Sequence, residues 1–361
     1  MVSPILELSN INKSFGHLQA NKDFSLKINH LTIHVIIGEN GAGKSTFLRS
    51  ITGLVSNTAD NISYRGNDMG AQVASDIVGQ GIAMVPEGRK LFPRLSVEEN
   101  LMIGGYSQRP GPWGLKRIYD MFPILQERKD LPGTALSGGE QQRVAVARSL
   151  ATRPRLILMD EPFSNLDYQL RVQLRQDIRD ILRKQGVATI LVTHDQSEAI
   201  TFSERLMLMN SGKLVQIGSP QEIYRYPRTL WAASFIGEAN LLTVELRNGL
   251  RCTNLGQLSL SRNSEEQAVT LMIRPEELRL ETPLANLPKG LITAIEFAGP
   301  VQNLSLTLDN GQILRASSSS QQIWSKGESV SVVPGNCLCY DKEGLLLEDE
   351  VSIKSAPTPN L

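Results

Sequence analysis

A glycine-rich segment ending in lysine and serine carries the most distinctive chemistry of this chain. It fits the spacing G-x-x-x-x-G-K-[ST] and directly follows an apolar run, ending at Ile37, that is typical of a buried strand. In such a loop, backbone N–H groups surround nucleotide phosphates, the lysine reaches the terminal phosphates and the serine hydroxyl binds Mg²⁺. The predicted nucleotide-binding residues are Gly38, Glu39, Asn40, Gly41, Ala42, Gly43, Lys44, Ser45 and Thr46.

Two adjacent carboxylates end a second apolar run, which spans Leu156 to Met159. Enzymes that cleave nucleotide phosphates place such a pair at the end of a buried strand, where it holds Mg²⁺ and polarises the attacking water. We therefore predict Asp160 and Ser45 as ligands of Mg²⁺. The alternative is a buried strand that ends in ordinary acidic turn residues.

His194 ends a third run, Thr189 to Thr193, and is one of only four histidines in the chain. A lone histidine is more often structural than catalytic. Its position argues otherwise, because the phosphate loop, Asp160-Glu161 and His194 each directly follow a predicted parallel strand. Open α/β sheets build their sites at this edge. We therefore predict that the three segments meet there.

The segment Leu136 to Arg143, with the sequence LSGGEQQR, is the second distinctive motif. Ser137 and Glu140 have the spacing of a capping box that starts a helix, and two glycines leave backbone N–H groups open to an anion. A capping box by itself is common and indicates no function. Together with the phosphate loop, the full run resembles the signature of ATP-binding-cassette (ABC) ATPases.

The resemblance to ABC ATPases implies ATP and Mg²⁺ as cofactors and suggests roles for further residues. Glu161 would be the general base for hydrolysis, and His194 would sense the γ-phosphate. Phe15 resembles the aromatic residue that stacks on adenine, although an isolated aromatic beside a first strand is as often part of a core. Signature residues in this family bind ATP held by a second subunit, which implies a homodimer or a pair with a sister ATPase. Those residues here are Ser137, Gly138, Gly139 and Glu140.

Two segments depart from the usual ABC pattern. Glu87 stands where the family usually places a glutamine that contacts Mg²⁺, which makes Glu87 a candidate catalytic residue and a candidate Mg²⁺ ligand. The segments 85–89 and 91–100 resemble the ATPases of branched-chain amino acid importers, where this replacement is familiar. The segment 29–32 lacks the Gly-Glu turn that usually precedes the strand before the phosphate loop.

Up to about Ile236, strand-like apolar runs alternate with helical patterns, which is typical of a parallel sheet with crossover helices. Apolar residues spaced three or four apart from Leu166 to Ile181 predict one helix, with Asp167 or Asn165 as its N-cap. Prolines divide the segment 86–135 into short helices, which the resemblance identifies as a helical subdomain at about 88–152. We therefore expect an α/β P-loop ABC ATPase domain at residues 1–238.

From Thr243 onward, short alternating runs predict strands. Asp309-Asn310-Gly311 lies between two of them and is a strong hairpin signal, because Asn and Gly tolerate positive φ. These patterns predict a small all-β, OB-like barrel at 239–351, a regulatory domain by resemblance, and a disordered tail at 352–361. The segments 106–114 and 317–322 are expected to be loops. The predicted strands are 243–246, 257–260, 269–273, 291–297, 304–308 and 330–333.

Composition argues against several classes of function. Lys plus Arg and Asp plus Glu both total 37, so the chain lacks the basic excess that nucleic-acid backbones attract, and no nucleic-acid partner is expected. No apolar run approaches the roughly 20 residues of a membrane span, and the start of the chain lacks the features of a secretory signal. The three cysteines lack zinc-binding spacing and are expected to be reduced and structural.

The segments 163–242 and 272–276 resemble the ATPases of ferric iron, polyamine and sulfate importers. The resemblance implies a peripheral ATPase at the cytoplasmic face of the membrane. Transmembrane permease subunits would be its direct partners, and a solute-binding protein an indirect one. The run Phe235 to Asn240 favours ferric iron as the solute. Polyamine, sulfate or molybdate, sugar and branched-chain amino acids remain alternatives.

Two functions of other classes also fit part of the sequence. A non-transport ABC ATPase, acting in translation or DNA maintenance, would be expected to carry two cassettes or a long coiled-coil insertion. Only one P-loop and one signature occur here. A ligand-sensing regulatory module stays open, because a sensing β domain and an ATPase domain could coexist. Ligand binding by residues 243–350 alone would distinguish this regulatory function from that of a transport ATPase.

Overall fold

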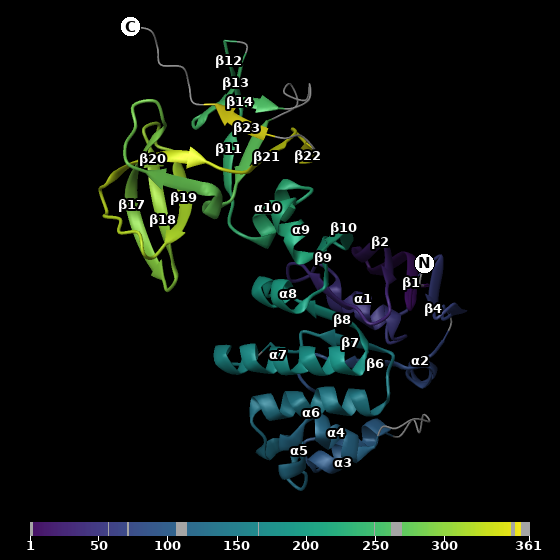
Figure 1. Cartoon of the computed structure of the whole chain (residues 1–361). Coiled ribbons are helices and arrows are strands. Elements are labelled where there is room, and N and C mark those ends of the chain that lie inside the picture. Colours follow the sequence, from purple (N-terminus) through teal and green to yellow (C-terminus); the bar gives the residue numbers. More distant parts are fainter. Residues whose placement is uncertain are drawn as a thin grey trace. The chain divides into compact units, whose positions relative to one another are not determined.

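The structure, a computed structural model, describes residues 3–354 except positions 57, 71, 106–113, 165, 249, 261–268 and 348–350. The chain divides into two compact units, Met1–Gln221 and Glu222–Leu361. In Figure 1 the colours run from purple to teal in the first unit and on through green to yellow in the second. The division lies earlier in the chain than the boundary at 238 that the sequence predicted.

The boundary differs because helix α10 (Leu230–Ile236) packs on strands of the second unit. Its Ala233 belongs to an apolar cluster with Met272 and Tyr340. The guanidinium group of Arg274 also donates a hydrogen bond to the Ala233 carbonyl oxygen at 2.9 Å. These contacts join partners far apart in the sequence, so a local pattern could not assign the helix to either unit.

The first unit is built on a six-stranded sheet with the strand order β10-β9-β3-β8-β7-β6. The strands from β9 to β6 run parallel, whereas β10 pairs antiparallel with β9. Every residue of β3, β7 and β8 is buried, as expected for strands covered on both faces. Because β8 lies between β3 and β7, the carboxyl ends of these three strands are neighbours. The bounds are β3 Ile33–Ile37, β6 Ile82–Val85, β7 Leu156–Asp160, β8 Ala188–Thr193, β9 Arg205–Asn210 and β10 Lys213–Gly218.

Several helices of the first unit begin at capping residues. Asp167 accepts a hydrogen bond from the backbone N–H of Leu170 at 3.0 Å and caps α7, which confirms one of the two predicted caps. The other candidate, Asn165, lies outside the described residues. Three short helices, α3 to α5, and the longer α6 lie within the segment predicted as the helical subdomain. The bounds are α2 Ala74–Gln80, α3 Val97–Gly104, α4 Leu115–Met121, α5 Pro123–Glu127, α6 Gly138–Ala151, α7 Tyr168–Gln185 and α8 Gln196–Phe202.

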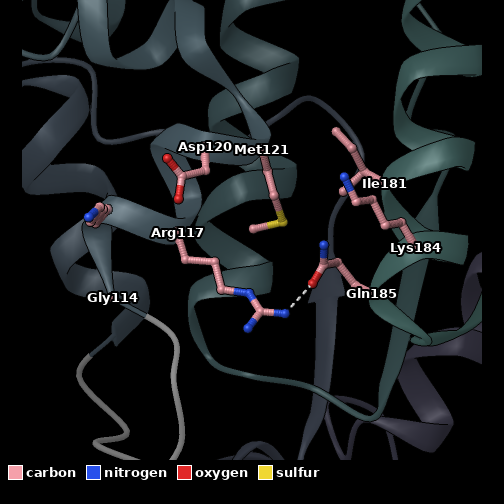
Figure 2. Close-up of a pocket in the computed structure, with 8 residues that line it drawn as sticks. Gly114, Arg117, Asp120, Met121, Ile181, Lys184 and Gln185 are labelled. Carbon is pink, nitrogen blue, oxygen red and sulfur yellow. Dashed lines mark hydrogen bonds between the residues drawn. The ribbon is translucent and has the colours of Figure 1, made fainter.

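A cavity of about 670 Å³ lies between α4 and the end of α7 (Figure 2). Arg117 donates across it to the side-chain oxygen of Gln185 at 2.6 Å. Part of the predicted loop at 106–114 precedes this cavity in the chain, but residues 106–113 lie outside the described part. None of the described helices combines the length and apolar character needed to cross a bilayer.

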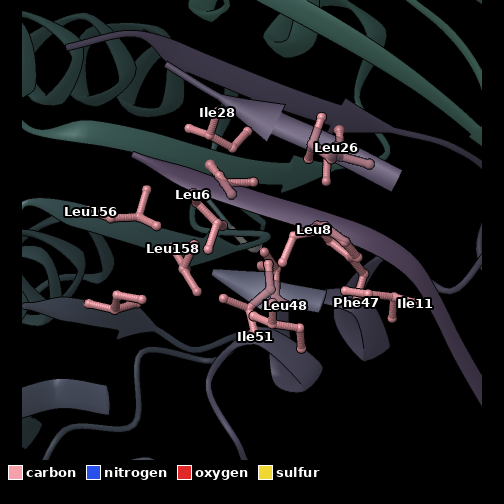
Figure 3. Packing of buried hydrophobic residues seen from close by; sticks show 14 of the residues in the cluster. Leu6, Leu8, Ile11, Leu26, Ile28, Phe47, Leu48, Ile51, Leu156 and Leu158 are labelled. Carbon is pink, nitrogen blue, oxygen red and sulfur yellow. The ribbon is translucent and has the colours of Figure 1, made fainter. Parts of the chain in front are cut away.

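An antiparallel sheet with the order β2-β1-β4-β5 forms the rest of the first unit, and the sequence pattern did not separate it from the parallel sheet. Leu6 and Leu8 of β1 share one apolar core with Phe47 and Leu48 of helix α1 (Figure 3). This packing holds α1, which begins at Lys44, against the strands. The bounds are β1 Leu6–Phe15, β2 Leu18–Ile28, β4 Asn61–Tyr64, β5 Asn67–Asp68 and α1 Lys44–Ile51.

The second unit consists mainly of strands, which confirms the predicted all-β class. They form three sheets with the orders β11-β15-β21-β22, β12-β13-β14-β23 and β16-β20-β17-β18-β19. The edge strands β16 and β19 of the five-stranded sheet also contact each other, so this sheet curls toward a barrel. The strands are β11 Asn240–Thr243, β12 Glu245–Arg247, β13 Leu250–Thr253, β14 Gly256–Leu260, β15 Thr270–Ile273, β16 Leu278–Glu281, β17 Lys289–Ala298, β18 Val301–Leu308, β19 Ile313–Ser319, β20 Ser329–Pro334, β21 Cys337–Tyr340, β22 Leu346–Leu347 and β23 Val351–Lys354, and helix α9 spans Pro220–Arg225.

Two local predictions for this unit were wrong at their first three residues, and one is confirmed. The 317–322 segment is not wholly a loop, because Ser317 to Ser319 continue β19 and pair with β18. The tail predicted at 352–361 begins inside β23, which pairs with β14. Its positions from 355 onward lie outside the described residues. The hairpin predicted at 309–311 joins β18 to β19, with Gly311 at φ 83°.

Candidate functional site

The phosphate loop connects β3 to α1, and close backbone contacts determine its shape. Gly43 has a φ of 95°, and a Cβ added there would lie 1.9 Å from the carbonyl oxygen of Ala20. A Cβ on Gly38 would lie 2.2 Å from the carbonyl oxygen of Met209. Only glycine fits at these two positions, so the spacing read from the sequence is also what the loop needs sterically.

Lys44 opens α1, and its ammonium group folds back over the loop. Nζ donates to the carbonyl oxygens of Gly38 and Glu39 at 2.8 and 2.9 Å, and the residue is 5% exposed. Burial lowers the pKa of Lys44, and the charges of Glu161 and Asp160 oppose this effect. The loop therefore holds a positive charge close to the carboxylates of Asp160 and Glu161.

The structure brings together the two residues predicted to bind Mg²⁺. Ser45 Oγ donates to Asp160 Oδ1 at 2.7 Å, while Oδ2 of Asp160 is buried and has no hydrogen-bond partner. Burial raises the pKa of Asp160 in spite of the Ser45 bond, and the charges of Glu87 and Glu161 add to the increase. A carboxylate oxygen without a partner, next to a hydroxyl group, is a donor set that suits a hard cation such as Mg²⁺.

Glu161 and His194, the two residues predicted to act on the γ-phosphate, are in contact. Glu161 follows β7 with a φ of 45°, and its backbone N–H donates to the Val192 carbonyl oxygen at 3.0 Å. This left-handed conformation costs a non-glycine residue about 1 kcal/mol. Glu161 Oε2 lies 3.0 Å from His194 Nδ1, with side chains 16% and 50% exposed. The pair is therefore accessible from the His194 side.

Glu87, the residue that departs from the family pattern, is exposed and follows β6. Gly88, Arg89 and Lys90 after it all have positive φ. Arg89 donates from Nη1 to Gln141 Oε1 in α6 at 2.8 Å. A cavity of about 190 Å³ lies between this turn, α6 and the turn after β7; its lining residues are Gly88, Arg89, Gln141, Gln142, Glu161, Pro162 and Ser164. The Glu87 turn therefore lies beside the helix of the signature motif.

The predicted capping box starts helix α6 at the signature motif. The Glu140 N–H donates to Ser137 Oγ at 3.3 Å, and the Ser137 N–H donates to Glu140 Oε2 at 2.8 Å. Hydrogen bonds from Ser137 lower the pKa of Glu140. Among the described residues, no hydrogen bond or ion pair joins residues 137–140 to the phosphate loop of the same chain.

Phe15 is not part of a core, which removes the structural alternative for this residue. It ends β1 and is 51% exposed. Lys13 Nζ lies 4.8 Å from the ring centroid. Cys252, Cys337 and Cys339 are free thiols, and Cys337 and Cys339 are buried.

A charged group that no sequence pattern predicted surrounds the turn that follows His194. Arg171 of α7 forms an ion pair with Asp195 at 3.2 Å, and Asp195 caps α8 by accepting from the Glu198 N–H at 3.0 Å. The spacing Asp195-x-x-Glu198 is a recognisable helix-start signal and could have predicted this cap. Arg171 carries no such signal, since its role depends on which face of α7 packs against the turn.

The larger cavity between α4 and α7 contains none of the predicted site residues. Its lining carries three basic side chains and one acidic one, with no member of the phosphate loop or of the strand ends (Figure 2). The lining residues are Gly114, Lys116, Arg117, Asp120, Met121, Ile181, Lys184 and Gln185. This cavity is therefore separate from the candidate catalytic site.

Comparisons with known protein families match both units. The model described as "ABC transporter" matches residues 21–164, and the model described as "TOBE domain" matches residues 271–337. The first match includes the phosphate loop, the signature motif and the carboxylate pair. The second lies within the all-β unit.

Curated relatives align with most of the chain. The Fe(3+) ions import ATP-binding protein FbpC of Pseudomonas fluorescens is 39% identical over 308 residues, which cover 83% of this chain and 86% of the relative. The putrescine transport ATP-binding protein PotG of Escherichia coli is 36% identical over 332 residues, which cover 87% of each. A solved dimeric structure of the ATP-binding cassette MJ0796, bound to ADP and Pi, is 27% identical with a TM-score of 0.53, over 60% of this chain and 98% of that one.

Proposed function

Since the chain belongs to the family of ATP-binding subunits of ABC transporters, we propose that its ATP hydrolysis powers the import of ferric iron through a membrane permease. Support for this solute comes from the relative at 39% identity, which is named for the import of Fe(3+) ions. The relative at 36% identity is named for putrescine, so polyamine import is the second candidate. The observation that carries the catalytic part is the meeting of Lys44, Asp160 and Glu161 at one edge of the sheet.

Mg²⁺ would be held by Asp160 and Ser45, with Glu87 as a further carboxylate. The buried, unpartnered Oδ2 of Asp160 supports this assignment, because a metal would satisfy it. The charge of Glu87, which contributes to the raised pKa of Asp160, supports its position near the same site. When bound, Mg²⁺ would offset charge on the phosphate oxygens.

In the proposed mechanism, Glu161 accepts the proton of the attacking water. Its contact with His194 Nδ1 orients the carboxylate. The left-handed backbone conformation of Glu161 sets the direction of its Cα–Cβ bond. Lys44 stabilises negative charge on the terminal phosphates. These roles need no movement of the buried strands, because Glu161 and His194 directly follow β7 and β8 and Lys44 begins the helix that follows the phosphate loop.

A second subunit would complete the site. The phosphate loop and the signature residues 137–140 share no hydrogen bond or ion pair within the described chain, which supports contact of the signature with ATP on a facing copy. The solved ATP-binding cassette MJ0796 is dimeric and holds ADP and Pi, which supports a dimer here. Phe15, with its exposed ring, would stack on the adenine.

We place the subunit at the cytoplasmic face of the membrane as a peripheral partner of transmembrane permease subunits. The relatives are named as import or transport ATP-binding proteins, which supports this position. A solute-binding protein would deliver the solute to the permease and act on this chain only through it. ATP-driven closure and hydrolysis-driven release of the dimer would then be coupled to the permease.

The test of solute is ATP hydrolysis by this chain co-purified with its permease and reconstituted with a solute-binding protein. We expect ferric iron to stimulate hydrolysis several-fold and putrescine or sulfate to leave it unchanged. Stimulation by putrescine alone would replace iron with polyamine as the solute. The Glu161→Gln variant is the control, since it should abolish stimulated hydrolysis in either case.

The test of the ATP site uses the same variant in solution. Glu161→Gln should bind ATP and accumulate as a stable dimer, whereas Lys44→Ala should lose ATP binding. Size-exclusion chromatography with and without ATP measures the first effect, and equilibrium nucleotide binding the second. Normal turnover by Glu161→Gln would show that another group is the general base.

A further inference from the structure

Arg171 joins the two turns that surround the proposed catalytic pair. Its Nη2 donates to the carbonyl oxygen of Leu166 at 2.9 Å, and its Nη1 lies 3.2 Å from Asp195 Oδ2. Leu166 belongs to the turn that follows Glu161, and Asp195 directly follows His194. One guanidinium group therefore binds both turns at once, a geometry that its planar fork of donors suits.

The contacts close into a ring. Glu161 Oε2 lies 3.0 Å from His194 Nδ1, and Ser164 Oγ donates to the Glu161 carbonyl oxygen at 2.9 Å. Leu166, two positions after Ser164, accepts from the guanidinium of Arg171, which also contacts Asp195 beside His194. Both ends of the catalytic contact are thus attached to the same side chain.

Hydrogen bonds within its own turn hold Asp195 in place. Its Oδ1 accepts from the Glu198 N–H at 3.0 Å, and its own N–H donates to Thr193 Oγ1 at 3.0 Å. Thr193 Oγ1 in turn donates to Glu198 Oε2 at 2.7 Å. Burial disfavours the charge on Asp195, but hydrogen bonds from Glu198, Ser197 and Arg171 outweigh it and lower its pKa.

The interior side of this group contains two more ionisable residues, and burial raises the pKa of one of them, Glu198, to about 7. Arg175, one turn along α7 from Arg171, is 8% exposed and Glu198 is 3% exposed. Arg175 Nη1 and Glu198 Oε1 are both buried without hydrogen-bond partners. The low local dielectric strengthens the hydrogen bonds that Thr193 and Asp195 do make. A shift of Leu166 reaches Asp195 through the guanidinium of Arg171, which contacts both residues.

We propose that Arg171 is a positioning residue for ATP hydrolysis, which holds the Leu166 turn and the His194 turn in the one arrangement that aligns Glu161. The proposal rests on the proposed roles of Glu161 and His194. It follows that a displacement of the Leu166 turn, such as the approach of a second cassette, reaches Glu161 through Arg171 and Asp195. ATP binding by the phosphate loop does not depend on this bridge, because within the described residues the hydrogen bonds of Lys44 Nζ go to carbonyl oxygens of the loop itself and none involves Arg171.

The first measurement is the separation of turnover from ATP affinity in Arg171→Gln. We expect kcat to fall at least about tenfold while the Kd for ATP stays within about twofold, since misplacement of a catalytic group affects the reaction and not the binding step. Arg183→Ala is the matched control, because Arg183 lies on the same helix and forms an ion pair with Glu204 at 2.7 Å. That variant should keep both values within about twofold of wild type.

A double-mutant cycle tests the bridge itself. Asp195→Asn keeps an effective N-cap and removes only the charge that faces Arg171. If the two residues act as one unit, the double variant loses no more kcat than the larger single loss. Additive losses, or an unchanged kcat in both single variants, would overturn the proposal. Arg171→Lys is expected to recover less than half of the lost kcat, because a single ammonium does not reproduce the fork.

These results remain distinguishable from the test of the proposed function. Normal turnover by Glu161→Gln would refute the general-base assignment and the bridge with it, because no group would be left for Arg171 to align. An inactive Glu161→Gln together with normal turnover by Arg171→Gln and Asp195→Asn would refute the bridge alone. If Arg171→Gln fails to fold, Asp195→Asn alone tests the bridge: a lowered kcat supports it and an unchanged kcat refutes it.

Discussion

The two compact units treat their buried polar atoms differently. In the first unit, Asp160 Oδ2, Arg175 Nη1, Glu198 Oε1 and His34 Nδ1 are among the buried side-chain atoms without a hydrogen-bond partner. In the described part of the second unit, Arg274 Nε is the one such atom. Three such atoms, Arg171 Nε, Arg175 Nη1 and Glu198 Oε1, belong to the group around the His194 turn, and Asp160 lies at the end of β7.

The second unit uses its buried polar groups to hold its own backbone together. Arg274 donates to the carbonyl oxygens of Tyr224, Ala233, Gly237 and Glu238 at 2.8 to 3.1 Å. Asn240 similarly bonds the backbone of β19 in both directions. Satisfied networks of this kind fix a structure, whereas unsatisfied groups at strand ends are available to a ligand. The comparison therefore separates polar groups that stabilise the fold from those that serve the reaction.

Asp160→Asn tests most directly whether Asp160 serves the reaction rather than the fold. The substitution keeps the shape and the contact with Ser45 but removes the carboxylate proposed to hold Mg²⁺. We expect turnover to fall at least about a hundredfold, or about 3 kcal/mol in activation free energy. The thermal unfolding temperature without nucleotide should stay equal or rise, because burial already disfavours the charge, as the raised pKa of Asp160 indicates.

Steady-state ATP hydrolysis and thermal unfolding check this result on the same preparation. Asp177→Asn serves as the control, since Asp177 lies near the protein surface and pairs with Arg143 at 2.8 Å. It should change neither turnover nor stability by much. A clear loss of stability in Asp160→Asn would place Asp160 among the structural groups.

The converse experiment removes from the second unit a side chain whose two terminal nitrogens are both hydrogen-bonded. Arg274→Met keeps much of the side-chain volume but leaves four backbone carbonyl oxygens without their donor, so we expect a loss of about 3 kcal/mol in unfolding free energy. Denaturant unfolding followed by tryptophan fluorescence is suited to this unit, which contains Trp231 and Trp324. The exposed Arg279 provides the control variant Arg279→Met. A loss below about 1 kcal/mol would contradict the structural role.

His34 tests whether an unsatisfied group of the first unit weakens its fold in acid. It lies within β3 at 2% exposure, and burial lowers its pKa to about 4 from 6.5. Above pH 6.5 both folded and unfolded states hold it neutral. As the pH falls from 6.5 to 4, only the unfolded state gains the proton, so the unfolding free energy drops by up to about 3 kcal/mol.

The measurement is unfolding free energy against pH for wild type and His34→Leu. The variant should lose this part of the acid sensitivity, so the two curves converge or cross below pH 6.5. His30 lies in the exposed turn before β3, which makes His30→Gln the matched control. Parallel curves for wild type and His34→Leu would show that His34 titrates alike in both states.

The sequence predicted the parts of the site that local spacing determines. A phosphate loop, a carboxylate pair and a capping box each depend on neighbours within a few positions, and burial of β3, β7 and β8 follows from continuous apolar runs. The bridge through Arg171 could not be predicted in the same way. It joins α7 to two turns, and only the packing of that helix determines which turn each arginine reaches.

Long-range pairing also explains the errors in the fold. Ser317 to Ser319 have a polar, loop-like composition, yet their register with β18 places them in a strand. The start of the predicted tail similarly pairs with β14, about a hundred residues earlier in the chain. Local propensity is a weak guide at such positions, because the partner strand provides the hydrogen bonds.

The smallest expected effect compares two open glycines, one in each unit. Gly311 in the β18–β19 hairpin has a φ of 83°, and a Cβ there would meet nothing within 4 Å. Gly311→Ala should therefore lose about 1 kcal/mol through backbone conformation alone. Gly79 lies inside helix α2 and is equally unobstructed, so Gly79→Ala should gain about 0.5 to 1 kcal/mol. Thermal unfolding of the two variants should shift in opposite directions, and a loss at both positions would mean that space, rather than φ, limits one of them.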